Sequence, residues 1–370
     1  MWVRIYALLI KEFLNLLKDK KSRFVLIGPP IFQLLVFGYA ATYDLNQVPI
    51  AIYNEDASIA SRDLIACFNG APAFREVLRI THHDQIAPTL DNKEALLIVH
   101  IGPHFSRDLL SAHRPAQLQI LLDGRDSNTA QIALGYVQSV LSDFNLNWAQ
   151  QHNLPLPPAK LEIRAWFNPN LESRWFIVPG IVGLLTLVVT VIVTALSVAK
   201  EREQGTFDQL LITPLSPLEI LIGKAIPSFI IGVIEASFII SMAVFWFQVP
   251  LVGSLVPLYI GIVLFVFAVI GIGLMISSLA VTQQQGLLGA FLFIVPAVIL
   301  SGYATPIANM PSLVQDLTLI NPLRYFLIIL RGVFLEGLNS RQLFDQYWPM
   351  AILGILSLSA AGWLFRRRLY

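Results

Sequence analysis

The sequence predicts a polytopic α-helical membrane protein, with six transmembrane helices and a mixed α/β extracytoplasmic domain between helices one and two. Its 370 residues are 55% hydrophobic and only 13% charged, whereas soluble domains carry about 25% charged residues. The apolar residues gather in long runs, and a helix needs ~20 of them to cross hydrocarbon. Between the first run and the others, residues 44–173 have an ordinary soluble composition.

The N-terminal region predicts a surface helix followed by a membrane anchor. Residues 1–23 alternate apolar and charged positions at helical spacing, which favours a cytoplasmic amphipathic interfacial helix. Residues 24–43 then form the first transmembrane helix. A cleaved signal peptide is the alternative, with small residues at Gly38 and Ala40, but the leader before the apolar run would be unusually long.

Residues 44–173 predict a mixed α/β domain, because strand-like and helix-like segments alternate. We expect strands at 49–56, 94–101 and 116–124, and helices at 58–68, 83–92 and 128–151. The trio His82, His83 and Asp84 could suggest a metal site, but a solvated helix cap at Thr81 or Asp84 is the better interpretation.

Residues 174–370 predict a five-helix transmembrane block. The spans lie at about 175–199, 222–247, 256–280, 286–304 and 345–365. Residues 198–224 form a charged segment between two of these spans. Residues 305–344 form an external re-entrant segment, because its apolar part, 323–338, is short and holds Arg324, Arg331 and Glu336.

Basic segments predict the orientation of these spans. The sequences KDKKSR, AKERE and RRR flank the first, second and last spans, and short basic loops stay in the cytoplasm. Both termini are then cytoplasmic and the 44–173 domain lies outside. The turn at Gln283, Gln284 and Gln285 is also cytoplasmic in this arrangement, although it carries no positive charge.

Composition and motifs exclude several function classes. The formal net charge of +1 gives no electrostatic case for nucleic acid. A single cysteine, Cys67, excludes an intrachain disulfide and a multi-cysteine metal site. The sequence contains no G-x-x-x-x-G-K-[ST], G-x-S-x-G or H-E-x-x-H motif. We therefore expect a chain that is not an enzyme and has no nucleotide-binding site of its own.

The most informative segment is 198–224, VAKEREQGTFDQLLITPLSPLEILIGK. A span ends in charged residues, a short amphipathic helix follows, and two prolines precede the next span. Its polar side would offer Glu201, Arg202, Glu203, Gln204 and Asp208 to a partner. By composition alone, a plain charged stop-transfer loop is an equally good interpretation.

The pattern K-E-R-E-Q-G-T-x-D-Q-L-L-x-[ST]-P-L, followed by Gly223 and Lys224 at the next span, resembles the coupling segment of the ABC type-2 exporter permease family. An N-terminal surface helix with the pair Lys11 and Glu12 is similar too. So are the late sequences LSGYATPIANMP and INPLRYF. WFNPN and LDGRDSNTAQIALGYVQ look like permease halves of a bacterial multidrug and cation exporter. The resemblance covers essentially the whole chain.

The resemblance implies a permease subunit of an ATP-driven exporter in the bacterial inner membrane, moving drugs, cations or other small amphiphiles out of the cytoplasm. A separate ABC ATPase subunit would bind ATP and Mg, and this chain would bind no cofactor. Other implied partners are a second permease copy or paralogue, a periplasmic adaptor protein and membrane lipid. The implied ATPase-coupling residues are Glu201, Arg202, Glu203, Gln204, Gly205, Thr206, Asp208 and Pro214. The turn at 282–285 would be either a solvated turn or a secondary ATPase contact.

Glu235 lies in the middle of a predicted span, and an ionisable residue there is a functional candidate. It would carry a proton or cation, or pair with a cationic drug, along the transport pathway. An interhelical hydrogen-bond partner is an equal alternative. Two other functions stay open, namely a secondary ion-coupled transporter that uses Glu235 and a membrane-anchored scaffold or binding module.

Overall fold

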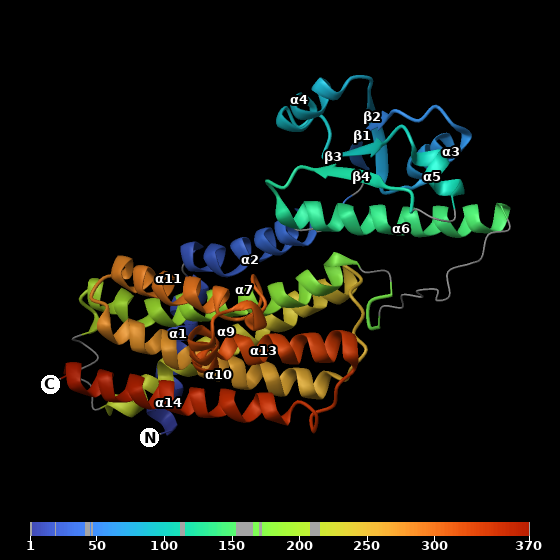
Figure 1. The fold of residues 1–370 in the computed structure, drawn as a ribbon. Coiled ribbons are helices and arrows are strands. Elements are labelled where there is room, and N and C mark those ends of the chain that lie inside the picture. The colour runs from blue at the N-terminus through green and yellow to red at the C-terminus, as the bar shows by residue number, and fades with distance from the viewer. Residues whose placement is uncertain are drawn as a thin grey trace. The chain divides into compact units, whose positions relative to one another are not determined.

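The computed structural model describes residues 2–18, 20–40, 45, 47–111, 115–152, 166–169, 172–207 and 215–369. The chain divides into two compact units. One comprises Met1–Thr42 with Ala165–Tyr370 and is called the helical unit; the other is Tyr43–Arg164 and is called the α/β unit (Figure 1). The location of the α/β unit outside the cytoplasm and the assigned domain boundaries stay predictions.

The α/β unit is built on a four-stranded sheet in the order β2-β1-β3-β4. Strand β1 pairs in parallel with β2 and β3, whereas β4 is antiparallel to β3. The strands are β1 Val48–Asn54, β2 Phe74–Ile80, β3 Leu97–Ile101 and β4 Leu118–Leu122. The helices are α3 Ile59–Gly70, η1 His83–Gln85, α4 Ile86–Asp91, α5 Phe105–Leu110 and α6 Ser127–Gln151.

Two apolar layers hold this sheet, one on each face. Alternate side chains of β1 face opposite ways, so Ile50 joins α3, α5 and α6 in one core while Ala51 joins α4 in the other. The long helix α6 runs beside the sheet (Figure 1). The predicted strands at 49–56, 94–101 and 116–124 are therefore present as β1, β3 and β4.

Strand β2 was not predicted, and its sequence explains why. Only Phe74 and Ile80 at its ends are buried, whereas Arg75 and Arg79 are exposed. A sheet edge tolerates and even favours such charges, so β2 lacks the alternation that marks a half-buried strand.

The turn after β2 corrects a predicted helix cap. Neither Thr81 nor Asp84 is the capping acceptor. Instead the Gln85 Oε1 accepts hydrogen bonds from the backbone N–H groups of Thr81 and His82. Within the described residues, no group of three potential metal ligands comes together, at the histidine pair or elsewhere.

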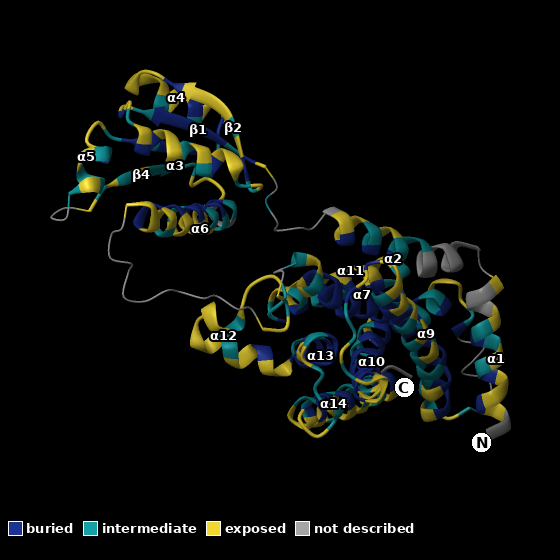
Figure 2. Cartoon of the chain, turned by 90° about the vertical axis from the view of Figure 1, so that its right-hand side faces the viewer, coloured by how far each residue is buried: buried dark blue, intermediate teal, exposed yellow. Residues whose placement is uncertain are grey.

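In the helical unit, the other helices pack around α7, which is apolar on all sides before its charged C-terminal end. This helix packs against α2, α9, α10, α11 and α13, and α14 packs mainly on α10. Figure 2 shows α7, α10 and α13 mostly buried, whereas α12 is mostly exposed. The helices are α1 Trp2–Lys18, α2 Lys20–Ala40, α7 Ser173–Glu203, α9 Pro217–Phe245, α10 Leu255–Leu279, α11 Gln283–Ile299, η2 Ile307–Asn309, α12 Ser312–Leu317, η3 Thr318–Ile320, α13 Pro322–Arg331, η4 Gly332–Glu336 and α14 Phe344–Leu369.

Four of the described helices are long and apolar enough to cross a membrane, namely α7, α9, α10 and α14. A fifth span results if the bent pair Ser312–Ile320 and Pro322–Glu336 is one broken span rather than a re-entrant loop. Helix α11 has 17 residues and is shorter, and α2 occupies most of the predicted first span. The chain is thus a polytopic helical protein, while the count of six spans stays a prediction.

The bend in the 305–344 segment has a local cause. The helix pair meets at 85°, where Pro322 begins α13 and Asn321 caps it by accepting a hydrogen bond from the Leu323 backbone N–H. The Asn321 Nδ2 donates to the Ala297 carbonyl at 2.7 Å. Asn321 therefore fixes the bend to the end of α11.

Candidate functional site

The candidate site begins where α7 ends, within the segment singled out in the sequence. Gly205 has φ of +68°, a left-handed conformation that glycine adopts without steric cost. Its N–H donates to the Arg202 carbonyl and the Thr206 N–H donates to the Glu201 carbonyl. This pair of bonds is a Schellman motif, which satisfies the last carbonyls of a helix. The Q-G-T part of the motif therefore stops α7 and turns the chain.

A buried ionic cluster joins α1, α7 and α9 beside this turn. The Lys224 Nζ lies 2.7 Å from Glu201 Oε2 and 3.1 Å from Glu12 Oε1. Lys11 Nζ lies 2.7 Å from Glu201 Oε1. The Lys224 side chain is 1% exposed, and it also donates to the Ser197 carbonyl. Two ammonium groups thus face two carboxylates, and the cluster is close to neutral overall.

The cluster stabilises one position of α1 on α9. A Cβ on Gly223 would lie 2.2 Å from the Leu8 side chain, so only glycine permits this close approach. Burial raises the pKa of Glu12 above its ordinary value of 4.5, Lys224 lowers it, and the Glu201 carboxylate raises it further. A lone carboxylate in this place would be costly to bury. Lys224 therefore compensates Glu12 and Glu201 together.

Arg202 and Glu203, the two residues after Glu201, tie the end of α7 to α10 and α11. The Arg202 Nη1 donates to the carbonyls of Ser278 and Ala280 at the end of α10. The Glu203 Oε2 accepts a hydrogen bond of 2.7 Å from the Gln283 backbone N–H, at the helix N-terminus where a carboxylate is favoured. The two predicted cytoplasmic turns, at 198–224 and 282–285, are thus in direct contact.

An apolar cluster beneath the turn joins a further helix. It contains Leu8, Val198, Phe207, Ile220 and Phe365. The rings of Phe207 and Phe365 meet edge to face, with centroids 6.0 Å apart, and the Arg202 guanidinium lies 5.0 Å from the Phe207 centroid. Helices α1, α7, α9 and α14 therefore share this contact, and we call the turn together with these contacts the junction.

The predicted coupling residues fall into three groups in this structure. Glu203, Gln204 and Gly205 are exposed, while Arg202 and Thr206 are half-buried. The expectation that Glu201 lies on the outward polar face is wrong, because its carboxylate points inward to Lys11 and Lys224. Asp208, Pro214 and the expected short helix between them lie outside the described residues.

The ionic partners of Glu201 were not predicted as a cluster. Lys11, Glu12 and Lys224 were noted only as parts of family-like motifs. The available signal was Lys224 itself, which is a lone charge within a long apolar run and needs a buried counter-ion. Which carboxylates supply it depends on how α1 and α7 pack on α9.

Glu235 is a second candidate, away from the junction. It lies in α9 and is 8% exposed, and among the described residues neither of its oxygens has a hydrogen-bond partner. One turn earlier, a Cβ on Gly232 would lie 2.8 Å from the Thr190 Oγ1 of α7. That hydroxyl is also buried without a partner in the described part of the chain. The α7–α9 region therefore holds unsatisfied polar groups in an apolar surrounding, and the ionisable Glu235 among them is a candidate functional position.

Comparisons with known proteins address the chain as a whole. A family profile described as "ABC-2 family transporter protein" matches residues 20–365. The chain is 40% identical to "Probable multidrug ABC transporter permease YbhR" of Escherichia coli, over 100% of both chains. It is 32% identical to the E. coli protein "Probable multidrug ABC transporter permease YbhS", over 91% of this chain and 89% of that protein. It is 30% identical to "Inner membrane transport permease YhhJ" of E. coli, over 98% of this chain and 94% of that protein.

Proposed function

Because the chain belongs to the ABC-2 family of transporter membrane proteins, we propose that it is the permease subunit of an ATP-driven exporter. ATP hydrolysis would take place on a separate ABC ATPase, since the sequence contains no phosphate-binding loop of its own. Relatives named as multidrug and inner-membrane transport permeases support this function.

The observation that carries the proposal is the junction at the end of α7. Glu203, Gln204 and Gly205 are exposed there, yet the same turn is bonded to α10 and α11 and packed on α1, α9 and α14. A force applied to the exposed residues would reach all these helices as a rigid-body motion. This property is what an ATPase docking surface on a permease requires.

The rest of the assembly is proposed on the same basis. The chain would pair with a second copy or a paralogue to enclose the pathway, and a periplasmic adaptor could join them. It would lie in the bacterial inner membrane with both termini in the cytoplasm and residues 44–173 in the periplasm. The cargo would be drugs, cations or other small amphiphiles.

The test uses a large side chain at an exposed position of the turn. Gln204 is exposed, and within the described residues its side chain makes no hydrogen bond or ion pair. It can therefore be enlarged without breaking the junction, and Gln204→Trp should block ATPase docking without other effects. We expect an ABC ATPase to co-purify with the wild-type chain, and substrate-stimulated ATP hydrolysis in lipid discs to be lost in the variant. Gln138→Trp, at an exposed position of α6, is the matched control. Normal complex formation and hydrolysis with Gln204→Trp would overturn the assigned docking surface.

Glu235 supports a second candidate function, a secondary ion-coupled transporter. Its buried carboxyl without a partner in the described residues could take up and release a proton or cation. With an imposed proton gradient as the driving force, the chain reconstituted alone would then transport substrate. Glu235→Gln would abolish this transport. Transport that strictly requires an ATPase and ATP would exclude this candidate.

A further inference from the structure

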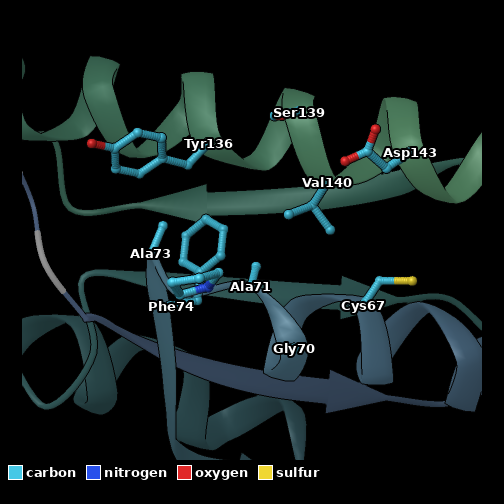
Figure 3. Close-up of a pocket in the computed structure, with 10 residues that line it drawn as sticks. Cys67, Gly70, Ala71, Ala73, Phe74, Tyr136, Ser139, Val140 and Asp143 are labelled. Atoms are coloured by element: carbon cyan, nitrogen blue, oxygen red, sulfur yellow. The ribbon is translucent and has the colours of Figure 1, made fainter. Parts of the chain in front are cut away.

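A groove on the α/β unit has the chemistry of a receptor for organic cations. It is an open groove with a volume of about 520 Å³, within the range of small-molecule sites. Figure 3 shows Tyr136, Val140 and Asp143 of α6 on one side of the groove, with Phe74 and the end of α3 on the other. The lining residues are Cys67, Gly70, Ala71, Pro72, Ala73, Phe74, Tyr136, Ser139, Val140 and Asp143.

One end of the groove is aromatic. The rings of Phe74 and Tyr136 meet edge to face, with centroids 6.3 Å apart, and Phe74 packs in turn on the buried Phe68. The first of these rings is anchored in the core, and the Tyr136 ring is only half-buried. Such ring faces attract both apolar groups and cations.

The other end of the groove is negative. Asp143 lines it, and both Asp143 and the nearby Asp63 are exposed, with no ion pair or hydrogen bond within the described residues. Burial raises the pKa of the Cys67 thiol between them, and the two carboxylates raise it further. Helix α3 ends at Gly70, between the two ends of the groove, and a helix C-terminus carries partial negative charge.

From this combination we propose that the groove binds an amphiphilic organic cation, with its apolar or aromatic body on Phe74 and Tyr136 and its positive group at Asp143. None of the described lining residues is basic, so an anionic ligand would be repelled. A bare metal ion would leave the aromatic end unused. Among the cargo classes proposed above, the groove thus selects lipophilic cations.

The binding site does not depend on the proposed function, but its use in export does. Under that function the groove would hold cargo at the α/β unit. If binding is observed and transport is not, the site stands and the export function falls. If transport is observed without binding at the groove, the export function stands and the proposed binding site falls.

The sole cysteine of the chain provides a direct test. Cys67 lines the groove, so alkylation of the detergent-purified full chain by N-ethylmaleimide reports on this place alone. Tetraphenylphosphonium is the probe, and its neutral counterpart is triphenylphosphine oxide. We expect saturable protection of Cys67 by the cation, with an apparent Kd about fivefold weaker in Asp63→Asn/Asp143→Asn, the change for about 1 kcal/mol.

Three comparisons complete the test. Asp84→Asn removes one charge from an exposed position outside the groove and should leave protection unchanged. Tyr136→Ala should weaken protection by both probes, because it removes part of the aromatic end. Protection is always expressed as the ratio of rates with and without probe, since the carboxylates themselves slow alkylation. Equal protection in the double variant and in Asp84→Asn, or no protection in the wild type, would overturn the proposal.

Discussion

At Lys224 a positive charge is buried within the largely apolar helix α9. The ammonium group is held by Glu12 and Glu201, which come from two other helices. A buried ion pair adds little net stability compared with an apolar pair, but removal of one partner is costly because the other charge stays buried. The cluster therefore acts chiefly as a selector of one arrangement of α1, α7 and α9.

Lys224→Met should be strongly destabilising. It leaves Glu12 without a counter-ion, and loss of a buried partner costs about 3–5 kcal/mol. The thermal unfolding midpoint in detergent should fall, and Lys224→Met/Glu12→Gln should recover most of the loss because Lys11 still pairs with Glu201. Lys11→Met, at a side chain that is 40% exposed, should cost clearly less. Equal stability of Lys224→Met and wild type would contradict the role of the cluster.

Gly205 and Gly135 form a matched pair of glycines. Gly205 has a left-handed backbone, so Gly205→Ala should cost about 1 kcal/mol. Gly135 lies in α6 with open space around its Cβ position, so Gly135→Ala should stabilise by about 0.5–1 kcal/mol. Thermal unfolding of the two variants measures both effects. The interpretation fails if both substitutions shift stability in the same direction.

At the scale of elements, the contact of α1 with α9 depends on size as well as charge. Leu8 occupies the space over Gly223, and the ionic cluster lies beside it. A surface helix of 17 residues is marginal on its own in water, so its stability comes mainly from such packing.

Gly223→Val should push α1 away from α9. Hydrogen exchange in residues 2–18 should rise, because α1 loses both its packing and its ion pairs. Leu8→Ala/Gly223→Val exchanges large for small across the contact and should restore much of the protection. Leu8→Ala alone should have the smaller effect of a cavity. If the double variant is no better protected than Gly223→Val, the two residues are not a packing pair in solution.

At the scale of the whole molecule, the two units have separate apolar cores. They can therefore respond differently to pH. In the α/β unit, the hydrogen bond from His100 and that from Tyr53 lower the pKa of Glu55. Burial raises the pKa of Asp56, but the hydrogen bonds from Ser106 and Ser58 lower it by more than burial raises it. The pKa of Asp56 is therefore below its ordinary value. Asp56 thereby links the end of β1 to the first turn of α5.

Acid should loosen the α/β unit. A carboxyl whose pKa is lowered by folding contributes stability above its unfolded value, here 4.5 for Glu55 and 3.8 for Asp56, and that stability is lost as pH falls through the folded value. Hydrogen exchange in residues 97–110, corrected for its intrinsic pH dependence, should rise below about pH 4. Asp56→Asn should raise exchange already at pH 7 and flatten the acid response. A flat profile in the wild type would contradict this assignment.

Several parts of the fold and site followed from local pattern. Alternation and turn residues predicted β1, β3 and β4, and apolar length predicted α7, α9, α10 and α14. Strand β2 escaped because its middle is charged and exposed, which is possible only at a sheet edge. The end of α7 was found through its motif, but the reason for Gly205 is a backbone angle that composition does not reveal.

By itself, the sequence determined that the chain is a polytopic membrane protein, that it lacks a phosphate-binding loop, and that its 198–224 segment resembles that of a transporter family. Only the tertiary structure decided that Glu201 faces inward, that Lys224 binds Glu12 from 212 residues away, and that Glu203 reaches the start of α11. The physical reason is that periodicity records which face of a helix is apolar, whereas a buried charge is neutralised by whichever helix packs beside it. The membrane-protein layout can therefore be predicted from the order of residues along the chain. The junction at the end of α7 forms only when the six helices α1, α7, α9, α10, α11 and α14 pack together.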